Sequence, residues 1–228
     1  MHSPTLRPWK DSDFEPFVEM NSDPDVMRYF LARLARNEAR EMFNRVRSTV
    51  DQRGWGVWAV EVNGAFAGMV GLNIPKWQLP FSPCTEVLWR LRKEFWGQGV
   101  AHSAASQAID YGFSKAGLEE IVAFTTPPNL RSIRLMERLG FDRDHHGDFD
   151  HPAVPEGHPL RRHILYRKRK PNMAPEPTTL AVTPTAERRV APARVVGSSL
   201  ALGETLRLDH LLPSAFVHDF HERLGASR

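Results

Sequence analysis

Cysteine is almost absent from this chain, with Cys84 alone among 228 residues. One thiol cannot form an intrachain disulfide, and this favours a reducing compartment. No apolar run approaches the roughly twenty residues needed to cross a bilayer. Arg7 and Lys10 precede the first apolar run, which excludes a signal-peptide pattern at the start of the sequence. We therefore expect a cytoplasmic protein without a membrane partner.

An excess of either charge is also lacking, since 30 Lys and Arg stand against 27 Asp and Glu. The basic residues are interspersed with acids, except over 161–170, so no broad nucleic-acid face is expected. A hydrophobic fraction of 41% is sufficient for one substantial core. The composition thus predicts a single globular domain with no nucleic-acid partner.

The domain is expected to occupy residues 1–170, where the apolar pattern is continuous. Residues 171–196 are rich in proline, alanine and threonine and are interpreted as a linker. Residues 197–228 regain apolar spacing and are expected as a short amphipathic helical tail that docks on this domain or on a partner. A homodimer is an open alternative.

Within the domain, helical and strand-like spacing alternate. The pair Asn63-Gly64 between two alternating runs predicts a hairpin, and Asp23-Pro24 predicts a short second helix. Asp11 or Asp13 is expected to cap the first helix. Further strands are expected at 6–9, 86–91, 120–125, 141 onward and 163–167, further helices at 37–52, 102–116 and 129–139, and a polar excursion at 145–159.

The segment Glu86 to Tyr111 reads as a strand, a glycine loop and a helix, a layout that binds phosphate through backbone amides and the helix dipole. A dinucleotide motif would need a third glycine where this chain has His102, and a Walker loop would need Gly-Lys-Ser/Thr. Since the loop lacks both the dinucleotide motif and the Walker motif, the cofactor is expected to carry a pyrophosphate but neither a nicotinamide nor a transferable γ-phosphate. Coenzyme A meets this description.

Four ordered stretches resemble the GNAT acetyltransferases, in particular the branch of the ribosomal-protein N-acetyltransferases. They cover residues 5 to about 168, and they are Leu6-Arg7-Pro8-Trp9 with Asp13, Glu86 to Leu91, Trp96 to Ala101, and Asn129 to Phe141. The resemblance implies an α/β (α+β) fold with a mixed, mostly antiparallel sheet that is splayed between the fourth and fifth strands and flanked by helices. It also implies acetyl-CoA as the cofactor.

On this resemblance the pantetheine arm bonds the backbone of Val87, Leu88 and Trp89, one of whose N–H groups holds the thioester oxygen. The pyrophosphate is expected on Gly97, Gln98, Gly99, Val100 and Ala101, with help from Ser103 and charge from Arg92 or Lys93. Asn129 is expected to bond the pantetheine amide, to cap its helix, or both. Glu94 departs from the family pattern, in which this position is Gln or Arg.

Amine acetylation needs a base, and Glu86 is the candidate, directly or through a water, because an apolar setting would raise its pKa. The alternative is a strand-end carboxylate in water or paired with Arg90. Many family members carry a tyrosine acid where this chain has Met136. Ser132 is what the resembling branch offers instead, with a simple helix-capping role as its alternative.

For the acceptor, Asp148 and Asp150 are expected in a loop that attracts a cationic amine, with Trp77 as a wall. The nearby histidines suit zinc as ligand types, but their spacing is irregular, and no metal is predicted. The sequence thus predicts an N-acetyltransferase that moves the acetyl group of acetyl-CoA to a small-molecule amine or a protein N-terminus. The alternative is a catalytically idle acyl-CoA-binding module.

Overall fold

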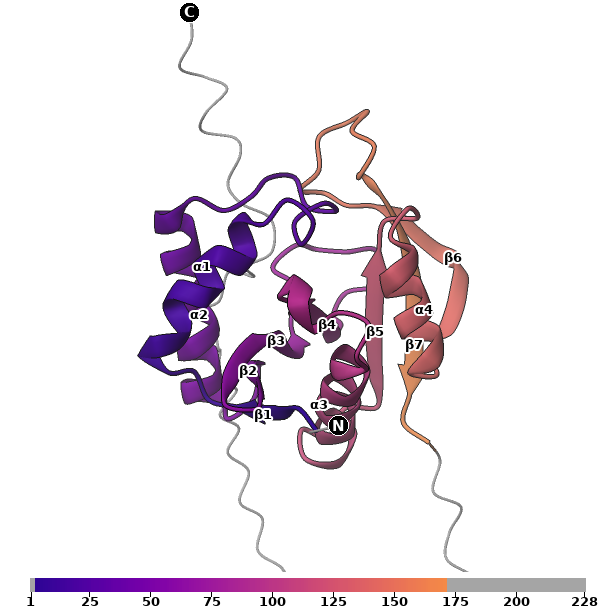
Figure 1. Ribbon diagram of the computed structural model, residues 1–228. Coiled ribbons are helices and arrows are strands. Elements are labelled where there is room, and N and C mark those ends of the chain that lie inside the picture. Colours follow the sequence, from indigo (N-terminus) through magenta and orange to yellow (C-terminus); the bar gives the residue numbers. More distant parts are fainter. Residues whose placement is uncertain (1–2, 172–228) are drawn as a thin grey trace, which may run out of the picture. The chain divides into compact units, whose positions relative to one another are not determined.

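A computed structural model describes residues 3–171 (Figure 1). The predicted tail at 197–228, and the predicted linker beyond Pro171, lie outside the described residues. The helices are α1 (Phe14–Ser22), α2 (Arg36–Arg53), α3 (Val100–Ser114) and α4 (Leu130–Arg138), with short 3-10 turns η1 (Asp11–Asp13) and η2 (Lys93–Phe95). The strands are β1 (Thr5–Arg7), β2 (Val57–Val62), β3 (Ala65–Asn73), β4 (Glu86–Leu91), β5 (Glu120–Thr125), β6 (Asp142–Asp150) and β7 (Arg162–Arg169).

The strands form one seven-stranded sheet in the order β1-β2-β3-β4-β5-β7-β6. All neighbouring pairs are antiparallel except β4 and β5, which are parallel. Parallel neighbours need a crossover connection, and α3 supplies it. The predicted mixed, mostly antiparallel sheet flanked by helices is confirmed.

The sheet opens between β4 and β5. Within the described chain these strands are in register only at Glu86 and Val122, where the Val122 N–H donates to the Thr85 carbonyl over 2.9 Å. Beyond that point no further register pair joins the two strands in the described part of the chain, and Figure 1 shows β5 as a long arrow next to the label of β4. The predicted splay between the fourth and fifth strands is thus present.

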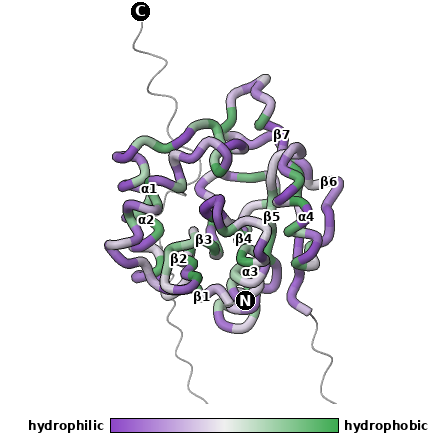
Figure 2. The backbone as a smooth tube through the Cα atoms, in the orientation of Figure 1, coloured by the Kyte–Doolittle hydropathy of each residue, from purple (hydrophilic) through white to green (hydrophobic). Residues whose placement is uncertain are grey.

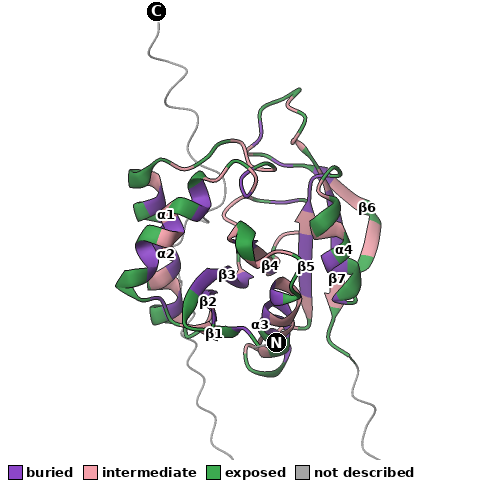
Figure 3. Cartoon of the chain, viewed as in Figure 1, coloured by how far each residue is buried: buried purple, intermediate pink, exposed green. Residues whose placement is uncertain are grey.

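Each face of the sheet has its own apolar core. On one face, α3 and α4 pack Ala105, Ile109 and Met136 against Val87 and Leu91 of β4. On the other face α1 and α2 pack against β2 and β3, with Trp9, Phe14, Phe17, Met20, Phe43, Val46 and Met69 among the buried residues. Figure 2 shows hydrophobic segments along β2 and β3, and Figure 3 shows β5 as mostly buried and β6 as a mixture of intermediate and exposed residues.

Local signals placed several elements correctly. Asn63 and Gly64 form the predicted hairpin turn with φ of 51° and 79°, values typical of a type I′ turn. Gly54 ends α2 in the left-handed region, with φ of 76°. These positions require backbone angles that few other residues adopt at low cost.

Three local predictions were wrong, each because a side chain or strand found a different partner. No helix starts at Asp23, because its carboxylate accepts from the backbone N–H groups of Asp25 and Val26 and forms turns instead. Asp13 does not cap α1, since its carboxylate is bonded by Arg7 and by the Lys10 N–H. Residues 145–150 are not a loop but the second half of β6, which pairs with β7 at Phe149–His163.

Among residues 3–171, no helix is both long and apolar enough to span a membrane.

Candidate active site

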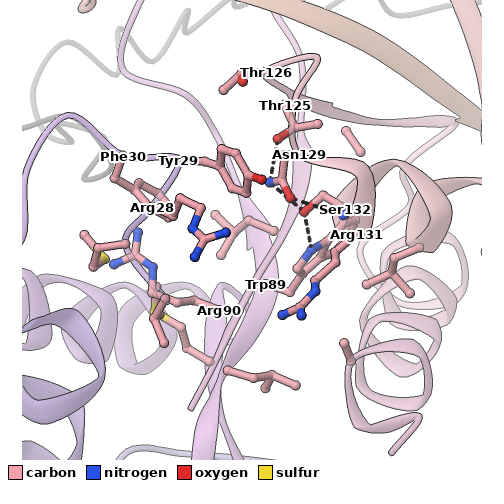
Figure 4. A pocket seen from close by; sticks show the side chains of 18 of the residues that line it. Arg28, Tyr29, Phe30, Trp89, Arg90, Thr125, Thr126, Asn129, Arg131 and Ser132 are labelled. Carbon is pink, nitrogen blue, oxygen red and sulfur yellow. Dashed lines mark hydrogen bonds between the residues drawn. The ribbon is translucent and has the colours of Figure 1, made fainter. Parts of the chain in front are cut away.

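A cleft of about 1760 Å³ lies where β4 and β5 separate. Its wall is formed by β4, the last residues of β5, the glycine turn with the start of α3, the first turns of α4, and the segment 25–35 between α1 and α2. Figure 4 shows side chains from β4, β5, α4 and this segment turned toward a common space. The topology therefore gathers into one cleft the segments that the sequence singled out.

Glu86 is buried in this cleft, with 8% of its surface exposed. It stands opposite Asn73 on β3, and Asn73 Nδ2 donates to Glu86 Oε1 over 2.7 Å. Burial raises the pKa of Glu86 to about 7, while the hydrogen bond from Asn73 acts in the opposite direction. Glu86 bonds Asn73 rather than Arg90 and can exchange a proton near neutral pH.

The backbone of Val87, Leu88 and Trp89 lines the same cleft. On one side these residues pair with β3, and on the other side no register with β5 is present among the described residues. Backbone groups directed toward β5 are therefore available to a ligand, as an unpaired strand edge is. This opening fits an extended chain with amide groups, such as a pantetheine arm.

Ser132 lies at the start of α4 in a small hydrogen-bond network (Figure 4). Its Oγ accepts from Trp89 Nε1 over 3.3 Å and from Asn129 Nδ2 over 3.0 Å. Because both bonds use the oxygen as acceptor, the hydroxyl proton remains to be donated. Asn129 also caps α4 by accepting from the Ser132 N–H and donates to Thr125 Oγ1 over 3.0 Å.

The glycine turn opens α3 as expected. Gly97 and Gly99 have φ of 73° and 79°, and Gly99 is the N-cap of the helix. A Cβ at either position would meet nothing within 4 Å, so space lies over the turn. The Ser103 N–H is bonded to the Gly99 carbonyl, which leaves the amides of Val100, Ala101 and His102 for an anion.

The negative charge of Glu94 is neutralised by Arg92 in the same turn, where Arg92 Nε lies 2.9 Å from Glu94 Oε1. This pair explains how a carboxylate is tolerated here, and it occupies Arg92, which also pairs with Glu19. The Gln98 side chain donates to the Glu94 carbonyl. Arg92, Gln98 and Ser103 are not among the residues that line the cleft.

Three arginines of α4 line the cleft, and none of them was predicted from the sequence as a site residue. They are Arg131, Arg134 and Arg138, with the Arg131 guanidinium 4.6 Å from the centre of the Trp96 ring. They follow Asn129 in sequence, but only the packing of α4 beside α3 brings them to the glycine turn. They are suited to hold phosphate charge beside the α3 amides.

The three residues predicted for the acceptor do not line the cleft. Asp148 is bonded by Arg143, and Asp150 is paired with Arg161 and Arg162. Trp77 is approached by Lys76, whose Nζ is 4.9 Å from the ring centre. In the described part of the chain, no group of three or more His, Cys, Asp or Glu could hold a metal ion.

The segment between α1 and α2 contributes cleft residues that no motif predicted. Tyr29 donates from its hydroxyl to the Pro128 carbonyl over 3.1 Å and so joins this segment to the β5–α4 turn. Arg90 of β4 is buried beneath it, bonded to Asn21 and 4.0 Å from the centre of the Phe30 ring. Burial lowers the pKa of Arg90 to about 9. Contacts between segments so distant in sequence leave no local signal.

Comparison with known proteins agrees with this arrangement. The family profile described as an acetyltransferase (GNAT) domain matches residues 5–142. The uncharacterized protein YkkB of Bacillus subtilis is 32% identical over 123 residues, which cover 52% of this chain and 69% of YkkB. The spermidine N(1)-acetyltransferase of Escherichia coli K12 is 27% identical over 151 residues, which cover 61% of this chain and 73% of that enzyme.

Solved structures share the fold. A GNAT-family acetyltransferase from Bacillus anthracis aligns with a TM-score of 0.60 at 24% identity and covers 73% of this chain and 94% of that one. The ribosomal L7/L12 α-N-protein acetyltransferase RimL, solved with coenzyme A, aligns with a TM-score of 0.60 at 14% identity and covers 73% of this chain and 94% of its own. At these identities the likeness concerns the fold.

Proposed function

The chain belongs to the GNAT family of acetyltransferases, and on that basis we propose that it transfers the acetyl group of acetyl-CoA to a primary amine by direct attack in a ternary complex. The observation that carries the proposal is Glu86. It is a buried carboxylate with a pKa of about 7, and it stands where the sheet opens. A group that is half ionised near neutral pH can both take up and release a proton during turnover.

Glu86 is proposed as the base. An alkylamine is mostly protonated at pH 7 and cannot attack until it loses a proton. The Glu86 carboxylate removes that proton, directly or through one water, and passes it to solvent after product leaves. Asn73 holds the carboxylate in position through its 2.7 Å hydrogen bond.

Acetyl-CoA would supply an acyl group that is activated as a thioester. A backbone N–H within Val87–Trp89 is proposed to stabilise negative charge on the thioester oxygen as the amine nitrogen bonds the carbonyl carbon. When the carbon–sulfur bond breaks, the Ser132 hydroxyl donates a proton toward the sulfur. Met136, at the position of the usual tyrosine acid, is fully buried in the core and cannot serve.

The cofactor seat is proposed at the start of α3. The amides after Gly99 and the guanidinium groups of Arg131, Arg134 and Arg138 surround this end of the cleft. The open space over Gly97 and Gly99 fits a pyrophosphate, since a ligand can approach the backbone there. Asn129 and the unpaired edge of β4 then face the pantetheine arm.

The names of two similar proteins support a primary amine as the acceptor class. One is named for acetylating spermidine and another for acetylating the N-terminus of a ribosomal protein. Both acceptors present a primary or terminal amine, which is the shared chemistry proposed here. The predicted cytoplasmic location and homodimer stay predictions.

A two-part measurement tests the proposal. Calorimetry with acetyl-CoA reports cofactor binding, and release of free thiol over a panel of primary amines reports transfer. The proposal expects micromolar or tighter binding and amine-dependent thiol release. Binding without transfer to any amine would contradict it and would favour an idle acyl-CoA-binding module.

A further inference from the structure

Thr126 is a buried hydroxyl in the wall of the cleft. The residue follows the end of β5 and is 2% exposed, and among residues 3–171 its Oγ1 has no hydrogen-bond partner. Buried hydroxyl groups are nearly always bonded, because an unsatisfied one lowers stability. A hydroxyl left unsatisfied beside a cleft is explained if a ligand satisfies it.

Thr126 belongs to the same face of the sheet as Glu86. Glu86 and Val122 are register partners, and alternation along an extended chain places Phe124 and then Thr126 on the face of Val122. Thr125 lies on the opposite face, where its hydroxyl is bonded by Asn129. Figure 4 shows Thr126 apart from the network of Thr125, Asn129 and Ser132. Thr126 thus belongs to the base side of the cleft and not to the Ser132 side.

Flat rings cover this face beyond Glu86. We call Phe81, Phe124, Phe149, His151 and His163 the aromatic wall. Phe124 stands in its middle, with ring centres of Phe149 at 5.4 Å and His163 at 6.0 Å. Phe124, His151 and His163 line the cleft. Burial lowers the pKa of His151 to about 4 and also lowers that of His163, so both imidazoles are uncharged at neutral pH.

The five residues of the aromatic wall include no carboxylate that could bind an acceptor with several positive charges. Asp148 and Asp150 are neutralised by arginines and lie outside the cleft. Among the charged residues of the cleft wall, basic side chains outnumber acidic ones. An acceptor with several ammonium groups would therefore meet repulsion rather than a row of carboxylates.

Distances along β5 set the order of the contacts. With a rise of about 3.3 Å per residue, Thr126 lies about 13 Å along the strand from the level of Glu86, and Phe124 lies about halfway. An acceptor whose amine reaches Glu86 would therefore pack its body on Phe124 and present its far end to Thr126. The hydroxyl of Thr126 can then donate to, or accept from, a polar group at that end.

We propose that the aromatic wall and Thr126 form the acceptor subsite, and that the acceptor is a primary alkylamine whose chain ends in an aromatic ring with a hydrogen-bonding group on the far side of the ring. This inference rests on the proposed function, because it assumes that Glu86 receives the amine. Flat apolar surfaces bury an aromatic ring favourably, and the single hydroxyl fixes its orientation.

The test compares two probes that differ only in a ring hydroxyl, tyramine and phenethylamine, in a thiol-release assay with the full-length chain at saturating acetyl-CoA. The wild type should show kcat/KM about tenfold higher for tyramine, since a site built to bond a hydroxyl discriminates against its absence. Thr126→Val should bring that ratio close to one, whereas Thr126→Ser, which keeps the hydroxyl, should preserve it. Spermidine should be a poorer substrate than either.

Three controls separate an effect on the acceptor subsite from effects on cofactor binding and on stability. Thr49→Val changes a hydroxyl on α2 that donates to the Arg45 carbonyl, and it should leave the tyramine preference intact. Calorimetry should give the same acetyl-CoA affinity for Thr126→Val as for the wild type. The melting temperature of Thr126→Val should be equal to or above that of the wild type, because the change removes an unsatisfied hydroxyl.

A tyramine preference that persists in Thr126→Val, or a preference for spermidine, would overturn the inference while the proposed function stands. Transfer to no amine at all, with acetyl-CoA bound, would overturn the proposed function and this inference with it.

Discussion

Asn73 and Glu86 face each other across β3 and β4, and the Asn73 amide donates to the Glu86 carboxylate over 2.7 Å. This hydrogen bond opposes the burial that raises the pKa of Glu86 to about 7. The pKa of Glu86 is therefore set by two opposite effects, since burial in the cleft raises it and the hydrogen bond from Asn73 lowers it.

Removal of that neighbour should move the pH dependence upward. In Asn73→Ala the carboxylate loses a donor that favours its charged form, so its pKa should rise above about 7. The pH midpoint of kcat/KM for the acceptor should shift to higher pH, with the plateau at high pH largely retained. A midpoint that stays in place would mean that Glu86 does not govern the rate.

Ser132→Ala should lower kcat by about 10- to 100-fold, because the sulfur would leave without a proton donor. Acetyl-CoA affinity should change little, and stability should fall by about 1–2 kcal/mol, since Trp89 Nε1 and Asn129 Nδ2 each lose an acceptor. Ser114→Ala on α3, where the hydroxyl bonds the Asp110 carbonyl at the surface, is the matched control. Equal rates for both variants would limit the Ser132 hydroxyl to its structural bonds with Trp89 and Asn129.

Gly99→Ala should weaken acetyl-CoA binding, whereas alanine at a glycine with the same backbone strain elsewhere in the chain should not. Gly99 and Gly64 share a φ of 79°, and a Cβ at either would meet nothing within 4 Å. Alanine at each should thus cost a similar amount, about 1–2 kcal/mol of folding free energy. Only Gly99→Ala should raise the Kd of acetyl-CoA, by about tenfold or more. If Gly64→Ala raised the Kd equally, the cofactor seat would lie elsewhere.

Stability should report the ionisation of Glu86 independently of activity. The folded-state pKa is raised from 4.5 to about 7, so the folded protein holds a proton that the unfolded chain releases between these values. The free energy of unfolding of the wild type should therefore fall as pH rises from 4.5 to 7. Glu86→Gln removes this loss and should be more stable at pH 8, by on the order of 2–3 kcal/mol, with no advantage below pH 4.5.

The exposed Glu156→Gln is the control for that comparison and should follow the wild type at every pH. A Glu86→Gln variant that unfolds with the same pH dependence as the wild type would show that folding does not raise the pKa of Glu86.

Sequence signals were most informative where a residue type is tied to one backbone angle or one cap. Asn63-Gly64, Gly99 and Asn129 each fixed the position of a turn or a helix start, because few residues substitute for them there. The strand-turn-helix segment after Glu86 was found for the same reason. These signals are local and need no knowledge of the fold.

Predictions failed where tertiary partners decided the outcome. Residues 145–150 carry mostly polar side chains, yet they complete an edge strand because β7 offers its free edge to Phe149 and Asp150. Asp148 and Asp150 then meet arginines of the same hairpin instead of the cleft. Ion pairs formed across paired strands depend on register, which the sequence did not specify here.

The cleft residues that were missed share another cause. Thr126 and Arg131 lie near the Asn129 motif and Tyr29 lies near none, but the relevance of all three depends on which face of a strand or helix meets which loop. A buried hydroxyl without a partner in particular is visible only once its surroundings are known.

The most direct test of Glu86 as the base is the pH dependence of kcat/KM for the acceptor, measured for the wild type and for Glu86→Gln at saturating acetyl-CoA. We expect a wild-type rate that rises with pH to a midpoint near 7, and a variant that is slower by about 100-fold or more and lacks this midpoint, with unchanged acetyl-CoA affinity. A Glu86→Gln variant that keeps both the wild-type rate and its pH midpoint would contradict it.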